Sequence, residues 1–300
     1  MATDSCIPLL DGMLLLDKPA AMSSNVALQK TKRLLGAKKA GHTGTLDPLA
    51  TGLLPICLGQ ATKFSRFLLA EDKAYDVTMM IGAATDTGDA EGQVIARSDV
   101  PILSSLQWQS VLEQFLGSSM QVPPMYSALK QNGQPLYKLA RAGKTVERPA
   151  RAIQVHVITY HGHQDDQLRF SVQCSKGTYI RSLVEDIAQS VGSHAHVTAL
   201  RRTKVGNFSI EHAYTLEELS EQIANSVNFR LIPLDAMVSA LPAMSIDLDQ
   251  ATALVQGRSV NVPGQGYAAD VAVFTEHGFA GIGVLEEEGV LRPKRMLSAS

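Results

Sequence analysis

Apolar residues recur along this chain with two spacings, and these predict a mixture of strands and helices. Short apolar or alternating runs predict strands at residues 13–16, 75–81, 152–160 and 168–174. Spacings of three and four predict helices from Ser23 or Ser24 to about Leu35, from Ser104 or Ser105 to about Leu116, and from Ile180 to about Val191. Strands and helices that follow one another without a steady βαβ rhythm predict an α+β fold.

The pattern changes near residue 240. A short helix is expected at residues 248–256, followed by three short strands at 271–275, 280–285 and 290–297 with polar turns between them. We therefore expect two domains, residues 1–240 and a small, mostly β domain at 241–300.

Composition narrows the class of protein. The 300 residues are 45% hydrophobic, which is enough for a large core, and no apolar run approaches the roughly 20 residues of a membrane span. No basic segment precedes residues 13–16, so a secretory signal is not expected. Three widely spaced cysteines, Cys6, Cys57 and Cys174, favour a reducing compartment, and we expect a cytoplasmic location.

The net charge of −2 does not by itself suggest a nucleic-acid partner, but the basic residues are clustered. The clusters lie at residues 30–39, 138–151, 201–204 and 292–295, whereas acidic residues gather elsewhere. Such segregation predicts a basic face suited to a polyphosphate backbone. The alternative is ordinary solvated helix surface.

The run from Gly41 to Gly52 contains the strongest candidate for chemistry, Asp47. Pro48 restricts its own φ and pushes Asp47 out of the helical region, and the glycines permit tight turns. A carboxylate on a rigid loop suits covalent or acid–base catalysis. The alternative is a surface turn in which Asp47 bonds its own backbone or caps a helix.

Other chemistries have weaker support in the sequence. Two close histidine pairs, His161 with His163 and His194 with His196, lack an evident third ligand, so no metal is expected. No Walker or Rossmann glycine pattern is present, and no cofactor is expected. Asp86-Thr87-Gly88 is similar to the Asp-Thr-Gly of aspartic proteases, which need two such carboxylates; a dimer would have to supply the second.

Several motifs, in order, resemble the TruB-type tRNA pseudouridine synthases. They are Gly12-Met-Leu-Leu-Leu-Asp-Lys-Pro19, Gly41 to Gly52, Lys73-Ala-Tyr75, Thr85-Asp-Thr87, Pro123-Pro-Met-Tyr-Ser-Ala-Leu-Lys130, Cys174-Ser-Lys-Gly-Thr-Tyr-Ile-Arg181 and His196-Val-Thr-Ala-Leu-Arg-Arg202. The resemblance implies a mixed, largely antiparallel sheet with flanking helices and a C-terminal PUA-like RNA-binding domain. One departure is Ala21, which stands where the family has glycine; a positive φ there would strain it.

The resemblance also implies roles for single residues. Asp47 is expected to be the catalytic aspartate, paired with Arg181, whose guanidinium would orient the carboxylate and lower its pKa. Tyr75 and Tyr179 are expected to contact the target base, and Tyr75 to take part in removing the C5 proton. Ordinary core packing is the alternative for both tyrosines.

Two further groups of residues are implied. Leu200 would form an apolar wall of the pocket, and His42 would contact the RNA near the everted base. The residues expected to bind RNA are Lys18, Lys130, Arg141 and Arg202.

The expected function is the isomerisation of uridine 55 in the T-loop of tRNA, by an aspartate acting on a flipped base. The expected partner is the tRNA T-arm, with no protein partner required and a monomeric state. The main alternative is a tRNA-binding or folding module without catalysis, and a dimeric protease built on Asp86 is the third hypothesis.

Overall fold

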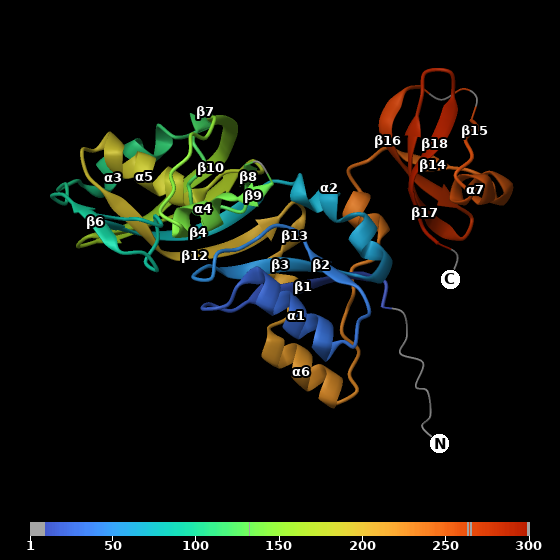
Figure 1. Ribbon diagram of the computed structural model, residues 1–300, viewed down its shortest axis with the longest axis horizontal. Helices are drawn as coiled ribbons and strands as arrows, with labels where there is room; N and C mark the ends of the chain where they lie inside the picture. The colour runs from blue at the N-terminus through green and yellow to red at the C-terminus, as the bar shows by residue number, and fades with distance from the viewer. Residues whose placement is uncertain (1–9, 132, 263, 265, 299–300) are drawn as a thin grey trace.

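The α+β fold predicted from the sequence is confirmed by a computed structural model, which describes residues 10–131, 133–262, 264 and 266–298. Cys6 lies outside the described residues. A large sheet with helices around it occupies most of the chain, and a smaller sheet is formed by the C-terminal residues (Figure 1).

The large sheet is mixed but mostly antiparallel. Its strands are, in pairing order, β1 (Gly12–Lys18), β3 (Thr51–Leu58), β12 (Ala195–Val205), β4 (Lys73–Ile81), β11 (Gln167–Cys174), β10 (Arg151–Gln164) and β7 (Gly117–Gln121). Only the β3–β12 contact along this path is parallel, and it brings Gly52 opposite Arg202. Strand β2 (Ala40–His42) pairs antiparallel with β3, and strand β13 (Phe208–Ser209) pairs antiparallel with β12.

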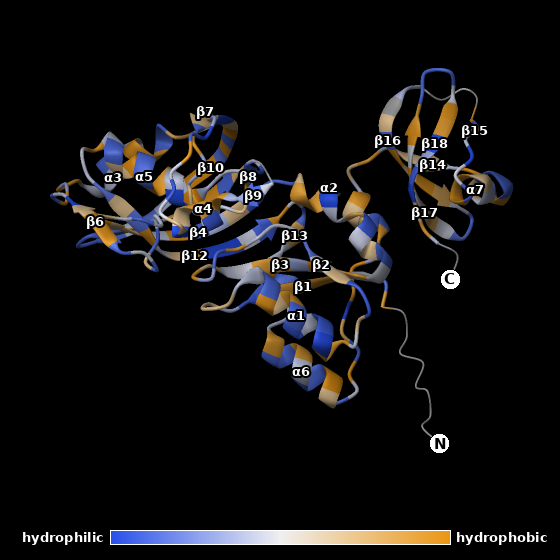
Figure 2. Ribbon diagram, in the orientation of Figure 1, coloured by the Kyte–Doolittle hydropathy of each residue, from blue (hydrophilic) through white to orange (hydrophobic). Residues whose placement is uncertain are grey.

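The helices at residues 24–34, 105–113, 180–190 and 248–255 begin and end close to where the sequence signals predict. The full set of α-helices in the described residues is α1 (Ser24–Leu34), α2 (Ser65–Leu69), α3 (Ser105–Glu113), α4 (Leu136–Arg141), α5 (Ile180–Ser190), α6 (Leu216–Ala224) and α7 (Leu248–Val255). The Ser23 side chain caps α1, and Ser104 forms a capping box with Gln107 at α3. Polar and apolar positions are interleaved on the helices and strands (Figure 2).

Helix α5 is fixed by its apolar stripe. Ile180, Leu183, Val184 and Ile187 are buried in the main core. Burying each such side chain stabilises the fold by about 1.5–3 kcal/mol. The first turn of α5, which carries Arg181, is therefore held firmly against the sheet.

The C-terminal sheet packs against the rest of the chain through an apolar contact. Its strands are, in pairing order, β14 (Ala243–Ser245), β16 (Ala268–Thr275), β17 (Gly278–Leu285), β18 (Val290–Met296) and β15 (Val260–Asn261). Phe279 of β17 meets Phe64 edge to face, with ring centroids 5.3 Å apart. Around this pair, buried residues of both sheets form one cluster that includes Met13 and Ile282.

Some elements have no counterpart in the sequence predictions. Helices α2, α4 and α6 and strands β2, β3, β7 and β12 to β15 were not expected, and α3 ends at Glu113 rather than near Leu116. The remaining elements are two hairpins, β5 (Ala83–Thr85) with β6 (Val94–Arg97) and β8 (Lys130–Gln131) with β9 (Gln134–Pro135), and the 3-10 turns η1 (Gly59–Lys63), η2 (Ile210–His212) and η3 (Asp235–Val238). Across the described residues, every helix is too short or too polar to cross a bilayer.

Candidate active site

The loop between β2 and β3 holds Asp47 in a constrained backbone. The amide of Ala50 donates to the Asp47 carbonyl at 3.1 Å, which closes a tight turn after the aspartate. Ser24 of α1 grips the preceding residue: its hydroxyl accepts from the Leu46 amide at 2.7 Å and donates to the Leu46 carbonyl at 3.0 Å. The rigid loop expected from the glycine–proline pattern is therefore anchored to a helix.

Asp47 and Arg181 form a two-point ion pair. Arg181 Nε lies 3.0 Å from Asp47 Oδ2, and Nη2 donates to Oδ1 at 3.3 Å. The arginine side chain is only 6% exposed, whereas that of Asp47 is 36% exposed. The carboxylate is thus oriented by a buried fork and still reachable from solvent.

The Arg181 guanidinium is itself fixed by three further groups. Nη1 donates to the Thr87 carbonyl at 2.8 Å and Nη2 to the Tyr126 carbonyl at 2.7 Å. Asp89 Oδ2 lies 3.5 Å from Nη1, and its side chain is equally buried. Asp89 was not among the residues predicted for the site.

Burial decides the ionisation of Asp47. Removal from water raises the pKa of Asp47, the charge of Asp89 raises it further, and Arg181 and Lys18 oppose both. Arg181 lowers the pKa of its partner, as expected, but burial outweighs this effect and the net direction is upward.

The two tyrosines lie on different elements that converge near Asp47. Tyr75 is buried on β4, and Tyr179 is half-buried as the N-cap residue of α5. The Asp47 charge contributes to raising the pKa of both phenols, after the larger effect of burial. Tyr179 lies two residues before Arg181, which contacts Asp47, and Tyr75 lies opposite Arg202, whose Nη2 donates to the Gly44 carbonyl of the Asp47 loop. Both tyrosines therefore belong to the surroundings of Asp47.

The buried side chain of Gln121, which was not predicted to belong to the site, holds the backbone of Tyr179. The Tyr179 amide donates to Gln121 Oε1 at 2.8 Å, and Gln121 Nε2 donates back to the Tyr179 carbonyl at 3.1 Å. The side chain of Gln121 thus pairs with the Tyr179 peptide much as a neighbouring strand would. No sequence spacing signals this contact, because it joins the end of β7 to the start of α5 across 58 residues.

Leu200 and His42 are close to this site in different ways. Leu200 of β12 is buried and lines a cavity of about 740 Å³ together with Leu49 and Glu91. His42 of β2 is half-buried, and its Nδ1 has no hydrogen-bond partner among the described residues. Burial and the nearby Arg202 charge lower the pKa of His42, which favours the neutral ring.

The four residues expected to bind RNA divide into two pairs. Lys130 and Arg141 are exposed on β8 and α4. Lys18 is completely buried and Arg202 is 1% exposed, so neither can meet a phosphate on the surface. The expectation that Lys18 and Arg202 contact RNA directly is corrected accordingly.

Lys18 instead joins the two loops beside Asp47. Its Nζ donates to the carbonyls of Met22 at 2.6 Å and Pro19 at 2.9 Å, with a longer contact of 3.4 Å to that of Pro48. Burial lowers the pKa of Lys18 to about 8. Backbone carbonyls and the nearby carboxylates compensate the buried ammonium.

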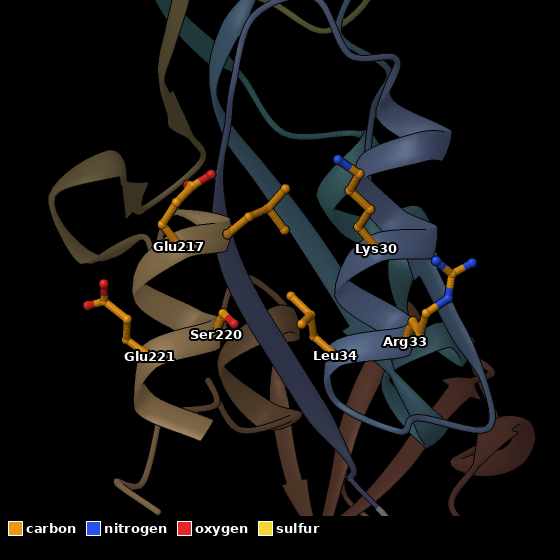
Figure 3. Close-up of a pocket in the computed structure, with 7 residues that line it drawn as sticks. Lys30, Arg33, Leu34, Glu217, Ser220 and Glu221 are labelled. Atoms are coloured by element: carbon orange, nitrogen blue, oxygen red, sulfur yellow. The ribbon is translucent and has the colours of Figure 1, made fainter. Parts of the chain in front are cut away.

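Part of the first basic cluster faces acidic residues. A groove of about 500 Å³ between α1 and α6 is lined by Lys30 and Arg33 on one helix and by Glu217 and Glu221 on the other (Figure 3). These opposite charges reduce the positive field there, so this end of the cluster is not a purely basic surface.

The competing motifs have structural partners of their own. His161 Nε2 bonds to the Ser171 hydroxyl at 2.9 Å, and His163 Nδ1 to that of Tyr160 at 2.7 Å. Within the described ranges, no three His, Cys, Asp or Glu side chains gather as metal ligands. Asp86 accepts from the Gln93 amide at 2.8 Å and so closes the β5–β6 hairpin.

The fold is that of pseudouridine synthase structures. The chain in a structure of an H/ACA RNP bound to a substrate RNA containing 2′-deoxyuridine superposes with a TM-score of 0.75 at 23% identity, covering 97% of this chain and 86% of that one. The corresponding chain of a Cbf5–Nop10–Gar1 complex gives a TM-score of 0.74 at 25% identity, over 100% and 87% of the two chains.

Sequence comparison resolves the family. Residues 32–180 match the TruB family pseudouridylate synthase (N terminal domain), 181–241 the tRNA pseudouridylate synthase B C-terminal domain, and 242–297 the C-terminal domain of pseudouridine synthase II TruB. The tRNA pseudouridine synthase B of Aromatoleum aromaticum is 49% identical over 97% of this chain and 94% of its own length. That of Stutzerimonas stutzeri is 46% identical over 96% of each. The chain belongs to the TruB family of pseudouridylate synthases.

Proposed function

We propose that this protein converts uridine to pseudouridine in tRNA, at position 55 of the T-loop, with Asp47 as the catalytic residue. The observation that carries the proposal is the two-point Asp47–Arg181 pair on an anchored loop, 3.0 and 3.3 Å between heavy atoms, with the carboxylate still partly exposed. Family membership and the names of relatives across nearly the whole chain support it.

The reaction is an isomerisation. The N1–C1′ bond breaks, the uracil turns, and a C5–C1′ bond forms; the C5 proton then leaves and N1 gains one. An ionised Asp47 can attack C1′, remove a C2′ proton to give a glycal, or attack C6 of the uracil. The three routes use the same carboxylate, and Arg181 would keep it aimed in each.

The remaining side chains have roles around the base. We propose that Tyr75 and Tyr179 contact the everted uracil, that Leu200 borders it, and that neutral His42 contacts the RNA beside it. Eversion costs a few kcal/mol, which contacts to the loop must offset. Tyr75, which is buried on β4, is the candidate acceptor for the C5 proton once its phenol is ionised.

The substrate would be held by surface charge and by the C-terminal sheet. Lys130 and Arg141 are exposed and are proposed to contact phosphates. We propose that residues 1–240 form the catalytic domain and 241–300 an RNA-binding domain. Because Asp47, Arg181 and Tyr75 come from one chain, we also propose a monomer that needs no protein partner.

The compartment is part of the same proposal. Cys57 and Cys174 are buried free thiols. Burial raises their pKa values to about 12 and about 11, so both are held as inert neutral thiols. Free thiols and a tRNA substrate together support a cytoplasmic location.

Replacement of the catalytic carboxylate tests the function. Asp47→Asn keeps the size of the side chain but removes its charge, and we expect tritium release from C5-labelled T-arm RNA to fall by at least about 10³-fold. Binding of the RNA, followed by filter retention, should stay close to that of the wild type. Full turnover by Asp47→Asn would refute the proposed role.

A matched variant separates the alternatives. Asp86→Asn makes the same chemical change at the β5–β6 turn, where the carboxylate only closes the hairpin. It should retain tritium release, whereas a protease built on Asp86 would lose its activity. If the wild-type protein binds the T-arm without releasing tritium, the noncatalytic tRNA-binding module becomes the better description.

A further inference from the structure

Arg202 is a buried cation that the proposed mechanism does not yet use. It lies on β12 with 1% of its surface exposed, opposite Tyr75 of β4 and Gly52 of β3. The backbone around it is closely packed: a Cβ on Gly52 would come within 2.3 Å of the Arg202 carbonyl oxygen. A guanidinium so deep in the protein is costly unless each of its donors has a partner.

The donors of Arg202 bind backbone carbonyls of the segment that carries Asp47, and Tyr75 lies beside Arg202 on the neighbouring strand. Nε donates to the Leu53 carbonyl at 2.7 Å, and Nη2 to the Gly44 carbonyl at 3.1 Å. These two carbonyls lie on either side of Asp47 in the sequence. Tyr75 is the cross-strand partner of Arg202 in the pairing of β4 with β12, so the two side chains stand side by side on one face of the sheet, and both residues are buried.

We propose that Arg202 is a positioning residue for the proton-transfer step: it holds the phenol oxygen of Tyr75 in place and supplies the positive charge that balances this oxygen when it is ionised. The inference rests on the proposed function, because it requires Tyr75 to accept the C5 proton. Arg202 need not touch the substrate; it acts through Tyr75.

The charges around the pair favour this assignment. Burial raises the pKa of Tyr75, and the neighbouring Asp47 and Cys174 would raise it further when ionised. Arg202 is the cation that opposes these effects at Tyr75. The other titratable groups near Arg202 are Lys18, His42 and Lys73, which are all basic. None of the three is among the charges that act on the Tyr75 phenol, so they do not take the place of Arg202 there.

The proton step balances without other reactants than water. Tyr75 first gives its phenolic proton to water and becomes a phenolate beside Arg202. After C5 has joined C1′, the C5–H bond breaks and the proton passes to the phenolate oxygen, which restores the neutral phenol. The electrons of that bond form the C5–C6 double bond, the former C6–N1 double bond becomes a lone pair on N1, and N1 takes a proton from water. Arg202 neither gives up nor receives a proton in this step.

Isotopic and halogenated substrates isolate this step. In Arg202→Met, we expect single-turnover conversion of uridine in T-arm RNA to slow by roughly 10- to 100-fold, part of what general base catalysis contributes. Deuterium at C5 should slow this variant more than it slows the wild type. With 5-fluorouridine at the same position there is no C5 proton to remove, and rearrangement should proceed at close to the wild-type rate.

Arg201→Met is the matched control. Arg201 is the neighbouring arginine, but its side chain is 43% exposed and pairs with Asp17 at 2.6 Å. Loss of Arg201 should leave the isotope effect at its wild-type value, whatever it does to RNA affinity. A raised isotope effect in this control would contradict a role specific to Arg202.

A second variant protects the test against misfolding. Arg202→Gln retains an amide donor for the backbone carbonyls but has no charge, and it should show the same selective loss with uridine and the same raised isotope effect. Equal slowing of uridine and 5-fluorouridine, with an unchanged isotope effect, would reduce Arg202 to structural support and overturn the proposal. Activity retained in Asp47→Asn would instead contradict the proposed function, so the two failures are distinguishable.

Discussion

The ionisation of Asp47 is set by the balance between loss of water and nearby charge. Its fork with Arg181 and the ammonium of Lys18 favour the carboxylate, while burial and Asp89 favour the acid, and the net effect raises the pKa of Asp47. Each proposed route needs the ionised form. Asp47, which every proposed route requires in its ionised form, therefore lies in surroundings that disfavour ionisation, as is common at catalytic sites.

This balance predicts the acid side of the pH profile. Because the pKa is raised, the carboxylate gains its charge at a higher pH than an ordinary aspartate, for which the value is about 3.9. Single-turnover activity should increase as pH rises through that shifted pKa and lie on a plateau above it. Measurement of the rate on T-arm RNA between acid and neutral pH checks this, and an acid limb at or below the ordinary value would contradict it.

Ala21 is a strained residue in the loop that Lys18 closes. Its φ is +56°, a conformation that costs an L-residue roughly 1–2 kcal/mol, and its side chain is exposed. Strain at this position was expected from the sequence if φ were positive, and it is.

Ala21→Gly should therefore stabilise the protein. Relief of the strain is partly offset by the greater freedom of glycine in the unfolded chain, which leaves about 0.5–1 kcal/mol of net stabilisation. For a chain of this size we expect the Tm to rise by roughly 1–4 °C, measured by calorimetry. Ala20→Gly, at the exposed neighbour without a positive φ, should not raise the Tm.

At the level of elements, the site depends on how β7 meets α5. Helix α5 has no side-chain cap of its own, and Gln121 at the end of β7 pairs with both backbone groups of its N-cap residue, Tyr179. This contact fixes the direction in which the helix leaves the sheet. Arg181 lies two residues later in the first turn of the helix, so the same contact determines where its side chain starts.

Gln121→Met should loosen this junction. The apolar side chain has a similar length but leaves the Tyr179 amide and carbonyl without their partner, at a cost of about 2 kcal/mol in the free energy of unfolding. Urea denaturation measures the loss, and single-turnover activity should fall with it because Tyr179 and Arg181 move together. Gln173→Met, at an exposed position of β11, should leave stability within about 0.5 kcal/mol.

The sequence predicts elements well where one face is buried and the other wet. The alternation in β11 and the stripe of α5 follow directly from that environment. Strand β3 is buried along nearly its whole length and contains Gly52 and Pro55, so it has neither alternation nor favourable composition. Its place in the sheet is set by partners on β1 and β12 that are distant in sequence.

The residues of the site also divide into those that local sequence indicates and those whose role depends on contacts distant in the chain. Asp47 stands out through local turn chemistry, and its pairing with Arg181 was expected from resemblance. Arg202 was expected to bind RNA as a member of the basic cluster at residues 201–204, and only the fold places carbonyls around it. Asp89 and Gln121 act through contacts with distant residues, which no local pattern reports.

At the scale of the whole molecule, the two sheets are joined by an apolar contact and a few polar ties. Phe279 packs edge to face with Phe64 and with Phe274, at centroid distances of 5.3 and 5.5 Å. Beside them, Lys63 donates to the Met296 carbonyl at 3.0 Å, and Arg66 lies 3.6 Å from Asp270. Exposed ion pairs contribute little, so the aromatic cluster carries most of the attachment.

Phe279→Ala should therefore weaken the attachment more than the chemistry. Loss of a partly buried ring costs about 2–3 kcal/mol and should lower the Tm and broaden the calorimetric transition, as the C-terminal sheet begins to melt separately. If this sheet positions the RNA, T-arm affinity should fall while the single-turnover rate at saturating RNA stays near wild type, because Asp47 and Arg181 lie outside the contact. Tyr267→Ala, at an exposed position of the same C-terminal region, is the control and should leave the transition unchanged. A fall in the single-turnover rate at saturating RNA, with unchanged affinity for the RNA, would instead mean that the Phe279–Phe64 contact determines the conformation of the loop that carries Asp47.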